Sequence, residues 1–156
     1  MMMSSKKLPT TINLHDLATY HVGAIESAAH RALRKHKDAC LQEYGITGMQ
    51  WYIIGYVLDG PRAGVRITDL AQNLGTTMAF MTNTVNLLES KNMLLRTSNT
   101  DDSRSSMIKV AAKFKPVCKK IEADLRQKLR TSIYSKVTPE ELTTYVKVIS
   151  KFTELD

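Results

Sequence analysis

Residues 67–91, which read ITDLAQNLGTTMAFMTNTVNLLESK, decide the fold of this chain. The first part predicts a short helix that opens at a threonine cap, Thr68, and stops at Gly75, with these apolar residues on one side: Leu70, Ala71 and Leu74. The second part predicts a helix over residues 77–91, because its inward apolar residues are spaced four and three apart: Met81, Val85 and Leu88. Two short helices joined by a glycine-containing turn form a helix-turn-helix.

A β-hairpin is expected directly after the second helix. Residues 94–97 and 105–110 favour strands, and the segment 98–103 between them has the composition of a turn. A helix-turn-helix followed by a hairpin is the order of elements in a winged helix-turn-helix. In that fold a helix fits the major groove of B-DNA, and the hairpin reaches the adjacent minor groove or backbone. The sequence therefore predicts a mainly α protein with a small β-hairpin wing.

Helices are expected on both sides of this core. Before it, the pattern predicts a long amphipathic helix from a cap at Asn13 to about Asp38 and a dense apolar helix over residues 49–58, which should run through the core. After it come a helix carrying apolar residues from Phe114 to Ile133 and a last helix that opens at Thr138, where Pro139 and a Thr138–Glu141 capping box mark the first turn.

No linker divides the chain, so a single domain over residues 1–156 is predicted, with a DNA-binding core at 47–110. Residues 10–40 and 112–156 have apolar faces larger than a small winged domain needs. We expect these terminal helices to form a homodimer, the alternative being a monomeric helical domain. A homodimer would place two recognition helices about 34 Å apart, which predicts a pseudo-palindromic operator.

Composition narrows the class of protein. With 43% hydrophobic and 24% charged residues the chain is typical of a soluble globular protein, and a net charge of +7 attracts polyanions, although a merely basic surface explains the charge equally well. No apolar run can span a bilayer, and residues 1–9 lack a secretory signal, so a cytoplasmic protein with no membrane contact is expected. Enzyme signatures such as GxSxG, a P-loop, GxGxxG and HExxH are absent, so neither catalysis nor a cofactor is predicted.

The outward side of the second helix carries small hydrogen-bonding residues. Asparagine pairs with adenine in bidentate fashion, threonine hydroxyls reach bases or phosphates, and the helix N-terminus favours a phosphate. A solvated polar face is the alternative interpretation. The outward positions are Thr76, Ala79, Thr82, Asn83 and Asn86.

Residues 67–110 resemble the DNA-binding core of the MarR family of transcriptional regulators. The resemblance rests on Leu88-Glu89, on Arg96 and on Asp102-Ser103-Arg104, which is similar to the D-x-R wing of that family; residues 47–51 also resemble the start of the family's second helix. The resemblance implies that Arg104 enters the minor groove and that Asp102 holds it. Without the family, an Asp and an Arg at a hairpin tip are an incidental exposed pair. The predicted DNA contacts are Thr76, Thr77, Ala79, Thr82, Asn83, Asn86, Arg96, Asp102, Ser103 and Arg104.

The sequence departs from the family pattern at several positions. Asn83 stands where an arginine is often found, and Ala79 replaces a hydroxyl residue. Asn92 occupies the glycine position, where asparagine can still adopt the left-handed conformation. After the wing, Val110-Ala111 and Phe114 replace the usual Leu-Thr and Gly. These changes leave the operator sequence open.

The resemblance also implies release from DNA by an anionic aromatic ligand or by thiol oxidation, as in many members of the family. Candidate contacts for an aromatic or phenolic effector are His21, Arg31, Trp51, Tyr52 and Tyr56, although helix packing explains the aromatic residues equally well. Cys40 lies near Lys35 and Lys37, which would lower its pKa and make it oxidisable, whereas Cys118 is expected to pack inertly. His36 and Cys40 have the spacing of two metal ligands but lack a third, so no metal site is predicted.

The function predicted is that of a homodimeric DNA-binding transcriptional regulator, a repressor, which an effector or oxidation releases. The alternative is a winged-helix protein-interaction module without DNA binding, because the recognition helix is weakly basic.

Overall fold

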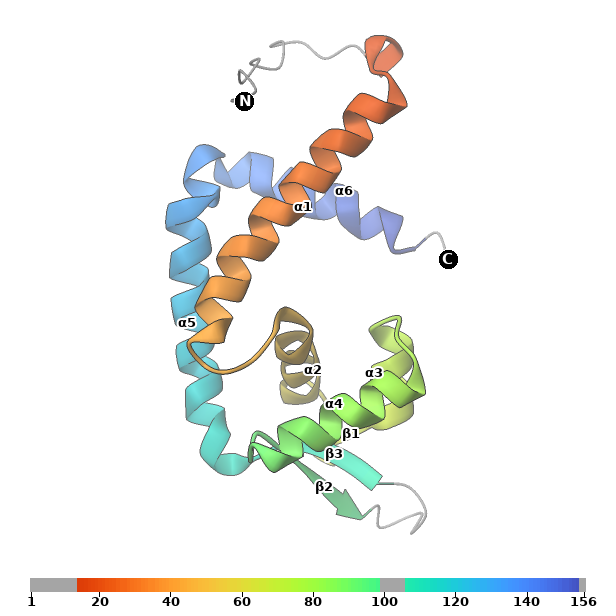
Figure 1. Ribbon diagram of the computed structural model, residues 1–156, viewed down its shortest axis with the longest axis vertical. Coiled ribbons are helices and arrows are strands. Elements are labelled where there is room, and N and C mark those ends of the chain that lie inside the picture. Colours follow the sequence, from red (N-terminus) through yellow and green to blue (C-terminus); the bar gives the residue numbers. More distant parts are fainter. Residues whose placement is uncertain (1–13, 99–105, 155–156) are drawn as a thin grey trace.

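A computed structural model describes residues 14–98 and 106–154 of the chain. Its lower half holds α2, α3, α4 and the strands, while α1, the second half of α5 and α6 form the upper half (Figure 1). The elements in chain order are η1 (Leu14–Asp16), α1 (Thr19–Gln42), α2 (Gly48–Leu58), β1 (Val65–Arg66), α3 (Ile67–Asn73), α4 (Met78–Ser90), β2 (Leu94–Ser98), β3 (Ser106–Val110), η2 (Ala112–Phe114), α5 (Lys115–Ser132), η3 (Tyr134–Lys136) and α6 (Pro139–Phe152). The mainly helical fold with a small wing is confirmed.

The predicted hairpin is part of a three-stranded antiparallel sheet in the order β1-β3-β2. β2 and β3 pair from Leu94 opposite Val110 to Ser98 opposite Ser106, within one residue of the predicted ends. The third strand, β1, was not predicted from the sequence; it pairs Val65 with Ile108. Gly64 makes this pairing possible: its φ is +104°, and an added Cβ would lie 2.9 Å from the carbonyl oxygen of Ile108.

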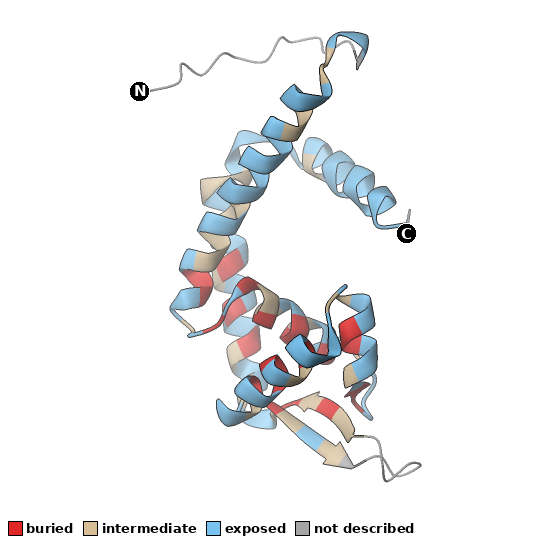
Figure 2. Ribbon diagram, turned by 45° about the vertical axis from the view of Figure 1, so that its right-hand side comes forward, coloured by how far each residue is buried: buried red, intermediate tan, exposed pale blue. Residues whose placement is uncertain are grey.

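The hydrophobic core lies between the helix-turn-helix and the sheet and extends to the adjoining ends of α1 and α5. Met81, Val85 and Leu88 of α4 are fully buried, which confirms the predicted inward face. Ile53 and Ile54 are also fully buried, so α2 runs through the core as predicted. Figure 2 shows the buried residues gathered in the lower half of the molecule.

Three helices end at a residue in the left-handed conformation. φ is +68° at Gly45, +59° at Gly75 and +56° at Asn92. The amide of the next residue then donates back to the last turn, as Thr76 does to Ala71 (2.9 Å) and Met93 to Leu88 (3.0 Å). The predicted stop at Gly75 and the left-handed Asn92 are confirmed.

Two predicted helix ends are wrong. Thr68 does not cap α3: the cap residue is Arg66, without a side-chain hydrogen bond, because the chain enters α3 directly from β1. α1 begins at Thr19 and ends at Gln42 rather than near Asp38, because the turn that stops it lies at Gly45. Asn13, the predicted cap, lies outside the described residues.

α6 contains no buried residue. The predicted capping box is present, with the Glu141 amide donating to Thr138 Oγ1 (3.2 Å) and the Thr138 amide donating to Glu141 Oε2 (2.8 Å). Figure 2 shows α6 exposed along most of its length, and Leu142 is half-buried, so most of its apolar side is uncovered in a single chain. Within residues 14–98 and 106–154, no helix is long and apolar enough to cross a bilayer.

Candidate nucleic-acid interface

The residues predicted to face outward on α4 are at least partly exposed. Ala79, Asn83 and Asn86 are exposed, and Thr82 is partly exposed, whereas the opposite side of the helix is in the core. Thr76, in the turn before α4, is also partly exposed. The helix lies over the sheet, next to the strands that lead to the wing (Figure 1). The arrangement therefore offers a polar helix face and a hairpin on one side of the molecule.

Thr77 has a structural role in addition to its predicted contact with DNA. Its Oγ1 accepts a hydrogen bond from the Phe80 amide (3.2 Å), which makes Thr77 the N-cap of α4. Because the hydroxyl accepts this bond, its own hydrogen remains available to an external acceptor such as a phosphate oxygen.

Arg96 connects the recognition helix to the wing. Its Nε donates to Glu89 Oε2 (2.8 Å), and its Nη2 donates to Asn86 Oδ1. The guanidinium therefore bridges β2 and α4, and it occupies the amide oxygen of a predicted DNA-contacting residue. Glu89 was not predicted as a site residue, although it belongs to the motif that carried the family resemblance.

Three exposed apolar side chains on α4 were also missed. Met78, Phe80 and Leu87 are 44%, 45% and 44% exposed. Leu87 falls between the buried Val85 and Leu88, and Met78 and Phe80 precede the first buried residue, Met81, at the exposed start of the helix. Next to the predicted contacts, they give the recognition helix a partly apolar surface.

The tip of the wing falls outside the described residues. Asp102, Ser103 and Arg104 lie between Ser98, the last residue of β2, and Ser106, the first of β3. Their predicted contacts with the minor groove stay predictions.

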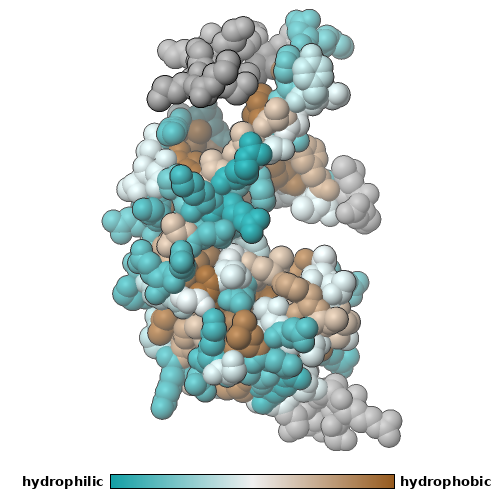
Figure 3. Space-filling view, in the orientation of Figure 1, coloured by the Kyte–Doolittle hydropathy of each residue, from teal (hydrophilic) through white to brown (hydrophobic). Residues whose placement is uncertain are grey.

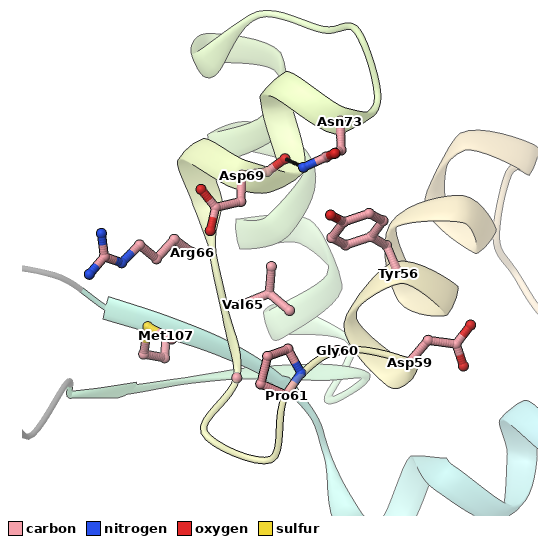
Figure 4. Close-up of a pocket in the computed structure, with 10 residues that line it drawn as sticks. Tyr56, Asp59, Gly60, Pro61, Val65, Arg66, Asp69, Asn73 and Met107 are labelled. Atoms are coloured by element: carbon pink, nitrogen blue, oxygen red, sulfur yellow. Dashed lines mark hydrogen bonds between the residues drawn. The ribbon is translucent and has the colours of Figure 1, made fainter. Parts of the chain in front are cut away.

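The five predicted effector contacts do not meet in one cavity. Tyr52 lines an open groove of about 690 Å³ between α1 and α2, where Lys37 Nζ lies 4.5 Å from the centre of the Tyr52 ring and donates to its hydroxyl. Tyr56 lines a different cavity of about 760 Å³, next to β1 and α3 (Figure 4). His21 and Arg31 line neither cavity, and Trp51 packs against the core.

The prediction that Cys40 has a lowered pKa is wrong. Burial, and then the charge of Glu43, raise the pKa of the Cys40 thiol, because both disfavour the thiolate. Lys37, which was expected to lower it, donates to Tyr52 instead. Cys118 is 1% exposed and packs in the core as predicted, and burial raises its pKa. Among the residues that the structure describes, no group of three His, Cys, Asp or Glu side chains could hold a metal ion.

A polar cluster fastens the end of α1 to α5. The Tyr44 hydroxyl donates to Asp124 Oδ2, and Lys120 Nζ lies 2.9 Å from both oxygen atoms. The hydrogen bond from Tyr44, and then that from Lys120, hold the pKa of Asp124 below its usual value. The bond to Asp124 likewise raises the pKa of Tyr44. The cluster therefore links the segment between α1 and α2, which carries Tyr44, to α5, which carries Lys120 and Asp124.

A helix-turn-helix packed on a three-stranded antiparallel sheet, with further helices on either side, defines a winged helix-turn-helix protein. Comparison with family models matches residues 44–105 to the MarR family. This match is to the family that the resemblance in the sequence predicted.

Several solved structures share the fold, and two of them are of MarR family transcriptional regulators. Sco3205 from Streptomyces coelicolor, solved in complex with DNA, is 20% identical and superposes with a TM-score of 0.79 over 88% of this chain and 92% of its own. AbsC from the same organism is 18% identical, with a TM-score of 0.75 over 88% of this chain and 95% of its own. MepR from S. aureus, solved in complex with DNA, is 19% identical, with a TM-score of 0.70 over 89% of this chain and 98% of its own. No curated protein matches the sequence.

Proposed function

We propose that this chain is a DNA-binding transcriptional regulator that acts as a homodimer on a pseudo-palindromic operator and represses transcription there. The observation that carries the proposal is the exposed face of α4, which Arg96 fixes to β2 beside the wing. The similarity to Sco3205 and MepR, both solved with DNA, supports the same function. A reporter gene placed behind the bound operator should be expressed less when the protein is present.

Salt dependence tests the DNA-binding part of the proposal. Each phosphate contact releases counterions, so binding to a duplex selected from a genomic library should weaken steeply as the salt concentration rises. Arg104→Ala should lower the affinity by about 1–3 kcal/mol. Arg126→Ala is the matched control, because it removes the same charge from an exposed position on α5, outside the winged core. If no genomic duplex binds in a salt-dependent manner, the protein-interaction module replaces this proposal.

The uncovered side of α6 supports the homodimer. The residues that are both apolar and exposed on it are Tyr145, Val146, Val148, Ile149 and Phe152. Beside them, α1, η3 and α6 form an apolar groove of about 270 Å³ that Ala32, Tyr134 and Tyr145 help to line. Figure 3 shows apolar atoms in the upper half, next to α1. A second copy of the chain would bury this surface by placing the same helices against each other.

We place effector release at the groove between α1 and α2. His30, Arg34 and Lys37 line it together with Tyr52, so basic and aromatic groups occur side by side. An aromatic carboxylate such as benzoate should weaken DNA binding. The Lys37→Ala substitution should reduce this weakening, while DNA binding measured without benzoate should stay unchanged. If benzoate weakens DNA binding by this variant as much as by the unsubstituted protein, the groove is not the effector site.

A further inference from the structure

The recognition helix has an unusual surface for binding a nucleic acid. α4 runs from Met78 to Ser90 with the sequence MAFMTNTVNLLES, which contains no lysine or arginine. In place of basic groups it exposes nearly half of each of three apolar side chains, Met78, Phe80 and Leu87. The positive charge of the chain therefore lies outside the helix that would enter the major groove.

The polar and apolar groups of this surface alternate. Phe80, Asn83 and Leu87 are three, four and seven residues apart, so they lie along one line of the helix surface. Asn83 is exposed, and no described hydrogen bond occupies its side chain. Asn86 differs, because its Oδ1 already accepts a hydrogen bond from Arg96. Asn83 is therefore the amide on this face that can offer a donor and an acceptor together.

These groups match one kind of base pair. Guanine is read in the major groove by arginine or lysine at O6 and N7, which α4 cannot provide. Adenine is read by the paired donor and acceptor of an asparagine, and thymine presents a methyl group that apolar side chains contact. We propose that α4 reads an A·T-rich half-site, with Asn83 paired to adenine and with Phe80 and Leu87 packed on thymine methyl groups.

This inference rests on the proposed function and specifies the DNA that would be bound. The apolar side chains are separated by Asn83 on a helix that packs against β2, an arrangement that suits a groove with alternating polar and methyl groups. Burial of one methyl group is expected to change affinity about fourfold. The apolar part of the surface can therefore contribute to sequence discrimination without any charged contact to a base.

Replacement of thymine by deoxyuridine tests the proposal, because it removes only the methyl group. Selection from a random duplex library should enrich A·T pairs in both half-sites. Deoxyuridine in the half-sites should then lower affinity about three- to fivefold for each contacted methyl group, with an unchanged salt dependence. The double variant Phe80→Ser, Leu87→Ser should lose most of this difference. Leu58→Ser is the control, because Leu58 has a similar exposure of 40% at the end of α2.

Asn83→Ala tests the adenine contact. It should reduce the preference for A·T over G·C at one position of each half-site by about 10- to 100-fold. Salt-dependent binding to G·C-rich half-sites, or a deoxyuridine effect that is absent or persists in the Phe80, Leu87 variant, would overturn the inference while the proposed function stands. Failure to bind any duplex would overturn both.

Discussion

A homodimer formed through α6 should depend on two of its exposed apolar residues, Val146 and Ile149. In the single chain these residues are 49% and 38% exposed, and they lie on the same side of the helix. We expect the double substitution Val146→Glu, Ile149→Glu to convert the dimer to a monomer. The protomer should still fold, because neither residue is buried in it.

The expected magnitude follows from these exposures. Complete burial of a Val or Ile side chain stabilises by about 1.5–3 kcal/mol, and somewhat less than half of each surface is still available for burial. Each residue then contributes about 1 kcal/mol to association, which gives about 4 kcal/mol for the two residues in two protomers. This corresponds to a dissociation constant raised about 1,000-fold, and the cost of burying four carboxylates raises it further.

Sedimentation equilibrium across a range of protein concentrations measures this change. Lys147→Glu is the matched control, because it alters charge on the same helix at an exposed polar position outside the apolar side. It should leave the dissociation constant within a few fold. A double variant that stays as dimeric as the unsubstituted protein, or a control that dissociates equally, would refute the assignment of α6 to the interface.

Four further outcomes are expected. Arg96→Ala should weaken DNA binding about three- to thirtyfold, since Asn86 loses its orientation, while it lowers the free energy of unfolding by less than about 1 kcal/mol because the ion pair is partly exposed. Gly64→Ala should destabilise by about 2–4 kcal/mol in urea denaturation, because the added Cβ meets backbone at a positive φ. Cys40 should react with iodoacetamide more slowly than free cysteine at pH 7, and its rate should rise only at higher pH. Asp124→Asn should reduce the loss of stability that occurs below about pH 4. The pKa of Asp124 is lower in the folded state than in the unfolded state, so the ionised side chain stabilises the fold at pH values above the unfolded-state pKa, and this contribution is lost as the pH falls through the folded-state pKa.

Each of these outcomes has a control. Arg126→Ala breaks a more exposed ion pair and should leave DNA binding nearly unchanged. Gly23→Ala adds a Cβ in open space on α1 and should stabilise slightly. For Cys40, the reaction in urea should match free cysteine, and equal rates in the folded protein would contradict the raised pKa. If the Asp124→Asn variant loses stability with falling pH as the unsubstituted protein does, the cluster with Tyr44 does not contribute.

Local sequence signals determined the helix-turn-helix and the hairpin. The inward face of α4 followed from residues spaced three and four apart, and the start of α6 followed from Thr138, Pro139 and Glu141. The left-handed Asn92 could also be predicted, because a helix that ends there needs a residue tolerant of positive φ. All of these features depend on groups within a few residues of one another.

Contacts between distant residues decided the rest. β1 forms only because Gly64 fits against Ile108, and Arg96 reaches Glu89 and Asn86 only once β2 lies beside α4. The pKa of Cys40 follows from its burial rather than from the lysines that precede it. The sequence thus determined which segments become helices or strands, since those preferences are local. Only the tertiary structure decided which polar groups pair and which apolar surfaces stay exposed, because burial and hydrogen bonding depend on neighbours that the chain brings together when it folds.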